Sequence, residues 1–84
     1  MNITKRTDYI TAQIEAIQDV VFDRMGFRSR PFGWQYIDAV NDIIKEMGER
    51  DILPHISHDV IEQLTQDNYH TAANAARLAQ VAYF

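Results

Sequence analysis

Apolar side chains recur every three or four residues along most of this chain, and this spacing predicts helices as the means of burying them. The first set shares one helical face and consists of Ile10, Ile14, Ile17 and Val21. Gly26 follows it, and glycine is the residue that most often ends a helix in a left-handed conformation. We therefore predict a helix over residues 8–25, with Thr7 as its N-cap.

A second set of apolar residues lies between Pro31 and Gly33 on one side and Gly48 on the other. Its inward stripe is expected to be Ile37, Val40, Ile44 and Met47. The helix would begin at Pro31 or Trp34 and end at Met47, with Gly48 as its stop signal. The link over residues 49–56 contains Pro54, which disfavours a helix at the residue before it. Three of its residues are too apolar for a free linker and should pack against the core: Ile52, Leu53 and Ile56.

The last third of the chain predicts two more helices, or one long bent helix over residues 57–84. A third helix would start at Ser57 or His58 and bury Val60, Ile61 and Leu64. A fourth, capped by Thr71, would run from Ala72 to Tyr83. This fourth helix has apolar groups on both sides, so it is either central or in contact with a second copy of the chain. The residues of this candidate homodimer helix are Ala72, Ala75, Leu78, Ala79 and Val81.

These patterns predict a single all-α domain over residues 1–84, a compact bundle of three to four short helices. The first two helices would be antiparallel across the turn from Gly26 to Gly33, and residues 1–6 would form a flexible basic tail. A chain of 84 residues that is 46% hydrophobic has enough apolar material for one core. It contains no cysteine, which excludes disulfides and cysteine-based zinc sites.

The net charge and the sequence motifs argue against several classes of function. A net charge of −4 and an isoelectric point near 5.1 argue against general binding to nucleic acid or to anionic membranes. No apolar run predicts a signal peptide or a membrane span, so we expect a cytoplasmic protein. His55 and His58 lack the further ligands of a metal motif, and no catalytic or phosphate-binding motif is present. We expect no enzyme activity, no cofactor and no bound metal.

One segment, residues 24–36, combines arginines and aromatic residues between two acid-rich segments. Arginine and large aromatic residues are enriched where proteins bind one another most strongly. The candidate partner-binding residues are Arg24, Arg28, Arg30, Phe32, Trp34 and Tyr36. In the competing interpretation Phe27, Phe32 and Trp34 fill the open end of the bundle, and the arginines pair with Asp23 and Asp38.

Two acidic rows form an alternative surface. Their members are spaced four residues apart and are Glu15, Asp19 and Asp23 in the first helix, and Asp38, Asp42 and Glu46 in the second. Successive members would rise about 6 Å along a helix, which resembles the spacing of phosphates on a nucleic-acid strand. The rows are consistent with a nucleic-acid mimic, or simply with solvated helix faces.

The favoured interpretation is a small non-catalytic protein-binding module: an adaptor, modulator or inhibitor that acts by occupying a surface. One alternative is an acidic nucleic-acid-mimicking inhibitor of the kind encoded by phages or mobile elements. Another is a small nucleic-acid-binding regulator. It would use residues 24–30 together with Lys5 and Arg6, or a final helix that presents Asn74, Arg77 and Gln80.

Overall fold

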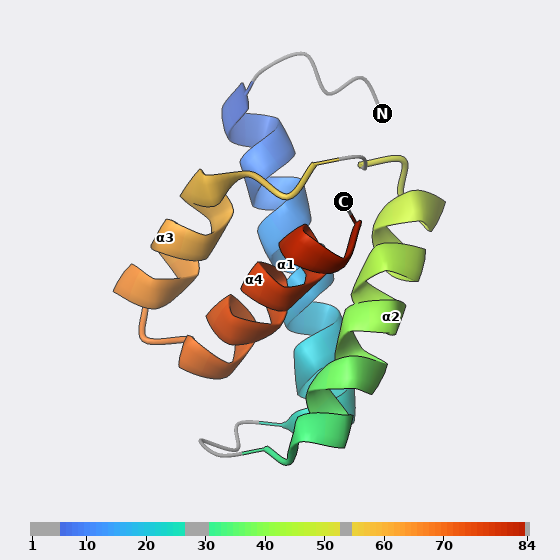
Figure 1. Ribbon diagram of the computed structural model, residues 1–84. Helices are drawn as coiled ribbons and strands as arrows, with labels where there is room; N and C mark the ends of the chain where they lie inside the picture. The colour runs from blue at the N-terminus through green and yellow to red at the C-terminus, as the bar shows by residue number, and fades with distance from the viewer. Residues whose placement is uncertain (1–5, 27–30, 53–54, 84) are drawn as a thin grey trace.

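The described part of the chain folds into four helices that pack around one core (Figure 1). A computed structural model describes residues 6–26, 31–52 and 55–83, and the side chains of residues 8–26, 31–52 and 55–82. The helices are α1 (Arg6–Met25), α2 (Gly33–Glu49), α3 (His58–Gln66) and α4 (His70–Tyr83). The predicted all-α fold is confirmed, and α1 and α2 pack against each other in antiparallel directions (Figure 1).

The start of α1 differs from the sequence prediction. Arg6 and Thr7 already belong to the helix, so Thr7 is not its N-cap and Arg6 is not part of a tail. The remainder of the predicted tail, residues 1–5, lies outside the described residues. At the other end, Gly26 has a φ of +61°, and its N–H donates to the Phe22 carbonyl over 3.1 Å. The predicted glycine stop of α1 is confirmed.

The predicted end of α2 at Met47, with Gly48 as its stop signal, is wrong, because the helix continues through Glu49. The left-handed residue is Asp51, with a φ of +59°. Its N–H donates to the Gly48 carbonyl over 3.2 Å, and the Ile52 N–H donates to the Met47 carbonyl over 2.9 Å. These two bonds form a Schellman motif that brings buried Ile52 back over buried Met47.

The break between α3 and α4 is confirmed and has the same geometry. Asn68 is left-handed with a φ of +65°, and its N–H donates to the Thr65 carbonyl over 3.1 Å. The Tyr69 N–H donates to the Leu64 carbonyl over 2.9 Å, which completes a second Schellman motif. Since α4 then begins at His70, Thr71 lies inside the helix and is not its cap.

Helix α4 is the central element of the bundle. It contacts α1, α2 and α3, and in Figure 1 it crosses in front of α1 between α3 and α2. Its alanines make this possible because small side chains let helix axes approach closely. The alanines of α4 that are 2% exposed or less are Ala72, Ala73, Ala75, Ala76 and Ala79. The predicted dimer residues Ala72, Ala75 and Ala79 therefore lie inside the chain's own core.

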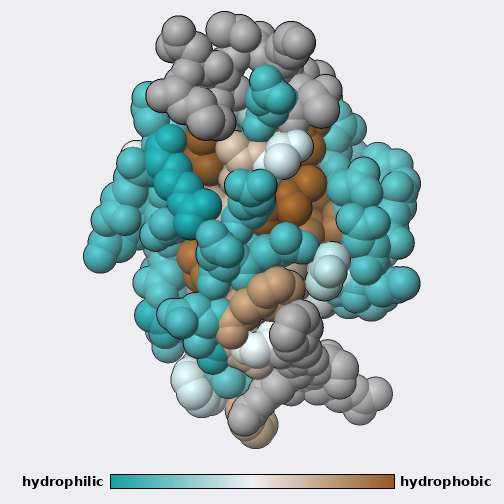
Figure 2. Space-filling model, turned by 180° about the vertical axis from the view of Figure 1, so that it is seen from behind, coloured by the Kyte–Doolittle hydropathy of each residue, from teal (hydrophilic) through white to brown (hydrophobic). Residues whose placement is uncertain are grey.

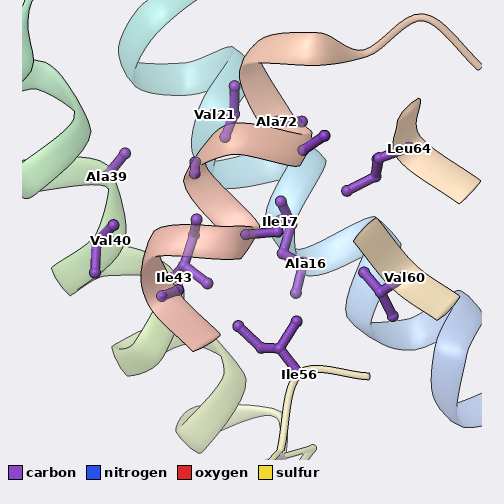
Figure 3. Close-up of a cluster of buried hydrophobic side chains, with 14 of the residues drawn as sticks. Ala16, Ile17, Val21, Ala39, Val40, Ile43, Ile56, Val60, Leu64 and Ala72 are labelled. Carbon is purple, nitrogen blue, oxygen red and sulfur yellow. The ribbon is translucent and has the colours of Figure 1, made fainter. Parts of the chain in front are cut away.

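Aliphatic side chains from all four helices, together with Ile56, meet in that core (Figure 3). The predicted apolar faces of α1 and α3 are confirmed. In α1, Ile17 and Val21 are buried, and Ile10 and Ile14 are partly buried against the core. In α3, Val60, Ile61 and Leu64 are buried. No aromatic side chain among the described residues is fully buried. The centre of this small protein is thus built without its largest side chains.

The predicted inward stripe of α2 is wrong at one position. Val40 and Met47 are buried and Ile44 is partly buried, but Ile37 is 64% exposed. Ala39 and Ile43, each 0% exposed, fill the core instead. The buried face of α2 is set by where α1 and α4 lie on either side of it, and Ile37 falls beyond the edge of this contact.

The segment between α2 and α3 is held by a glutamine that the sequence analysis overlooked. Gln13 is fully buried, and its Nε2 donates to the carbonyls of Ile52 and His55 over 2.9 and 2.6 Å. Its Oε1 accepts from the Ser57 N–H over 3.2 Å. Ile52 and Ile56 are buried as predicted, whereas Leu53 lies outside the described residues.

Candidate functional site

The most distinctive exposed side chains stand where α2 begins. Phe32 is the N-cap residue, in extended conformation, and its N–H donates to the Gln35 Oε1 over 2.7 Å. A phenylalanine has no oxygen to return such a bond, so this is one half of a capping box. The rings of Phe32 and Trp34 lie nearly parallel, with their centroids 6.5 Å apart and an interplanar angle of 9°.

Both rings face water. Phe32 is 66% exposed and Trp34 is 63% exposed. Each helical residue advances about 100°, so the nine residues from Trp34 to buried Ile43 turn the indole to the side opposite the core. The interpretation in which these two rings fill the end of the bundle is therefore wrong. Phe27, the third ring in that interpretation, lies outside the described residues.

Arg24 approaches this pair from the last turn of α1. It forms ion pairs with Asp42 and with Asp38, the latter over 3.8 Å, and the hydrogen bond with Asp42 raises the pKa of the guanidinium. A small hollow of about 70 Å³ is lined by Arg24, Trp34, Gln35 and Asp38. We call the surface formed by Arg24, Phe32, Trp34, Gln35 and Asp38 the aromatic site.

The other predicted partner-binding residues do not extend this site. Tyr36 is only partly exposed and packs against the core cluster. Arg28 and Arg30 lie outside the described residues. Of the six predicted residues, three therefore lie together: Arg24 in the last turn of α1, and Phe32 and Trp34 at the start of α2.

The two acidic rows meet along the contact between α1 and α2. Four of their residues, Asp19, Asp23, Asp42 and Glu46, line an open hollow of about 400 Å³ together with Val20, Lys45 and Glu49. Glu15 is exposed on α1 but does not line the hollow. The face of the molecule turned away from the viewer of Figure 1 is mostly hydrophilic, with narrow apolar strips (Figure 2).

Two arginines, Arg24 and Arg50, form ion pairs with carboxylates of these rows. A role for Arg50 was not predicted from the sequence. Arg50 donates to Asp19 over 2.8 Å and to Glu46 over 2.9 Å, and both hydrogen bonds raise its pKa. With Arg24 bound to Asp38 and Asp42, four of the six predicted acidic residues share a cation. Each pair lowers the negative potential that a nucleic-acid mimic would present.

Arg24 and Arg50 bind carboxylates of the acidic rows, and Lys45 lines the same hollow. Arg6 and Arg24 are 18 residues apart in α1, and at 1.5 Å per residue they lie about 27 Å apart along its axis. The fold therefore does not bring Arg6 to the segment that follows Arg24. On α4, Arg77 donates to the Asn74 Oδ1 over 3.1 Å.

The described part of the chain shows neither a metal site nor a membrane span. It contains no group of three His, Cys, Asp or Glu side chains that could hold a metal ion. His55 and His58 are both exposed. None of the helices within this part has the length and apolar character needed to cross a membrane.

A second exposed feature is a hollow of about 360 Å³ between α2 and α4. It is lined by Ile37, Val40, Asn41, Leu78, Val81 and Ala82, which we call the apolar groove. Three of these side chains are large and well exposed: Ile37 at 64%, Leu78 at 48% and Val81 at 70%. Leu78 and Val81 belong to the predicted homodimer helix, whereas the predicted position of Ile37 was on the inward stripe of α2.

Comparisons with protein-family models, with curated proteins and with solved structures found no match for this chain.

Proposed function

We propose that this protein is a non-catalytic protein-binding module that contacts its partner through the aromatic site. The observation that supports this is the exposed, stacked pair Phe32 and Trp34, together with a core in which no ring of the described side chains is fully buried. A small domain gains more from burying large rings than from exposing them. Rings that remain outside therefore suggest a use in recognition.

The chemistry of the site suits a protein surface. The stacked rings offer flat apolar area, while Arg24 and Asp38 beside Trp34 offer a cation and a carboxylate for polar contacts. A hot spot of this kind typically has an apolar centre and a polar rim. Such a contact needs no reaction, so the protein would act by occupying a surface as an adaptor, modulator or inhibitor. We propose the cytoplasm as its setting.

The size of the effect can be estimated from exposure. Burying a large apolar side chain fully is worth about 1.5–3 kcal/mol, and both rings are about two-thirds exposed in the free protein. Removing both should therefore cost about 3 kcal/mol of binding free energy. At 1.4 kcal/mol for each factor of ten, this corresponds to a loss of affinity of about 100-fold.

The test compares protein capture from a lysate of the source organism by immobilised wild type and by the double variant Phe32→Ala, Trp34→Ala. We expect a protein that the wild type retains and the double variant loses. His58→Ala is the matched control, because it removes another exposed ring, on α3 and outside both the aromatic site and the apolar groove. Circular dichroism should show equal helix content in all three proteins.

Two results would contradict the proposal. One is capture of the same proteins, in the same amounts, by the double variant. The other is a double variant that unfolds at a much lower temperature than wild type, because the rings would then be needed for folding. A labelled oligonucleotide tests the nucleic-acid-binding alternative, which predicts a complex that dissociates steeply as salt is raised.

A further inference from the structure

The two rings of the aromatic site are held in place by different means. Trp34 belongs to the first turn of α2 and lines the small hollow together with Arg24, so its position follows from the helix and its neighbours. Phe32 precedes the helix and is mostly exposed. Between the two aromatic residues lies Gly33, which has no side chain to restrict the backbone there. The stacked arrangement therefore depends on what holds Phe32.

Gln35 supplies the bonds that hold Phe32. The Phe32 N–H donates to the Gln35 Oε1 over 2.7 Å. The Phe32 carbonyl accepts from the backbone N–H groups of Gln35 and Tyr36 over 3.0 and 3.4 Å. A serine or threonine at this position would also accept a bond through its own side chain, which phenylalanine cannot do. The Gln35 side chain thus closes a loop across Gly33 and fixes the direction in which Phe32 leaves the helix.

We propose that Gln35 is the positioning residue of the aromatic site, because its side chain holds the ring of Phe32 parallel to that of Trp34 in the free protein. The inference rests on the proposed function, since it concerns how the same site reaches its binding strength. The two rings have an interplanar angle of 9°. Attraction between rings favours offset-stacked and edge-to-face arrangements alike, so it does not select the parallel one. The bond to the Phe32 N–H does so by orienting the backbone that carries the ring.

A preset pair of rings binds more tightly than one that must first be ordered. Ordering a side chain during association subtracts from the binding free energy. A partner that meets Phe32 and Trp34 already parallel gains one flat apolar surface without this loss. Removing the Gln35 oxygen should therefore weaken binding by about two- to ten-fold. This is less than the loss expected when the rings themselves are removed, because both rings remain available.

The first test is nuclear magnetic resonance of the free protein. Gln35→Met keeps the length of the side chain but removes the oxygen that accepts from the Phe32 N–H. Gln35→Glu keeps an oxygen there, and glutamate serves as well as glutamine in a capping box. We expect nuclear Overhauser effects between the ring protons of Phe32 and Trp34 in wild type and Gln35→Glu, and their loss in Gln35→Met. Exchange of the Phe32 N–H should be faster by about five-fold in Gln35→Met, the effect of one ordinary hydrogen bond.

Gln66→Met is the matched control. Gln66 is exposed on α3, and its amide donates to the Glu62 side chain over 3.4 Å. The substitution makes the same chemical change away from the aromatic site, so the ring contacts and the exchange of the Phe32 N–H should equal those of wild type. Circular dichroism should show the same helix content in all variants, because each retains the backbone bonds at the start of α2.

The second test measures the affinity of each variant for the protein that wild type captures from the lysate, followed by the fluorescence of Trp34. Gln35→Met should bind about two- to ten-fold more weakly than wild type. Gln35→Glu and Gln66→Met should bind as wild type does. Rescue by glutamate separates positioning of Phe32 from a general effect of changing the helix.

Three results would overturn the inference: unchanged ring contacts in Gln35→Met, loss of these contacts in Gln35→Glu, or equal affinity of Gln35→Met and wild type for the captured protein. Failure of the proposed function looks different. In that case Phe32→Ala with Trp34→Ala would capture the same proteins as wild type, while the measurements on the free protein would still decide whether Gln35 holds Phe32.

Discussion

Replacing Gln13 by methionine should destabilise the protein by about 3 kcal/mol. Methionine has nearly the shape of glutamine but cannot make the bonds of Gln13 to Ile52, His55 and Ser57. Each lost bond to a buried or partly buried group costs about 1 kcal/mol, and more where the partner is left without another. The Ile52 carbonyl keeps one donor, the hydroxyl of Tyr9, which limits the total.

The loss caused by Gln13→Met is a large fraction of the free energy of unfolding, so it can be measured. A chain of 84 residues is expected to have a free energy of unfolding of about 4–13 kcal/mol. For a domain of this size, a loss of 1 kcal/mol lowers the midpoint of thermal unfolding by about 4–8 °C. Gln13→Met should therefore lower it by about 12–24 °C, as followed by circular dichroism at 222 nm.

A matched control separates this effect from the substitution itself. Gln63 is an exposed glutamine on α3 whose amide donates to the two carboxylate oxygens of exposed Asp67, over 3.1 and 3.3 Å. Gln63→Met should change the free energy of unfolding by less than about 0.5 kcal/mol. If Gln13→Met lowered the midpoint by less than about 4 °C, the segment over residues 50–57 would not depend on this side chain, and the reasoning would fail.

Three further predictions concern helix ends and surface charge. Gly26→Ala should cost about 1 kcal/mol because of the positive φ, whereas Gly33→Ala should be neutral or slightly stabilising, as measured by urea unfolding. Among the described residues, no atom beyond the immediate chain neighbours and the local helix backbone lies within 4 Å of a Cβ added at either glycine, so the difference reports the backbone conformation. Asp51→Gly should stabilise the protein by about 0.5 kcal/mol, seen as a higher urea midpoint, because its left-handed conformation suits glycine. Arg50→Ala should cost about 0.5–1 kcal/mol at low salt and less at about 1 M salt, because its two ion pairs are solvent-accessible.

The helical class and most helix positions could be predicted because they follow from local patterns. The Ile17 and Val21 face of α1, the glycine stop at Gly26 and the break before α4 all depend on residues close together in sequence. Local patterns failed at the end of α2, where Gly48 is the obvious terminator. The left-handed residue that ends the helix is instead Asp51, because this position lets Ile52 fold back into the core.

The error at Ile37 has a different cause. Helical periodicity fits the stripe through Ile37 and Val40 as well as the stripe through Ala39 and Ile43, and alanine contributes little to an apolar pattern. The buried stripe is chosen by the positions of α1 and α4, which come from distant parts of the sequence. The same holds for Gln13, whose partners are about 40 residues away and give no local signal.

The candidate site was only partly accessible to sequence reasoning. Composition identified the segment that contains Phe32 and Trp34, but it could not decide between an exposed pair and a plug for the bundle. That choice depends on the register of α2, which turns Trp34 away from Ile43. Composition also could not place the apolar groove, since its walls, Ile37 and Leu78, are 41 residues apart in the chain.

The location of Trp34 has a practical consequence for optical experiments. It is the chain's one tryptophan, and it stands mostly in solvent both before and after the polypeptide loses its helices. Its emission spectrum should therefore change little during denaturation. It should shift to shorter wavelength when a binding partner buries the indole away from water. Unlabelled protein thus carries an intrinsic fluorophore suited to titrations of complex formation and poorly suited to measuring denaturation.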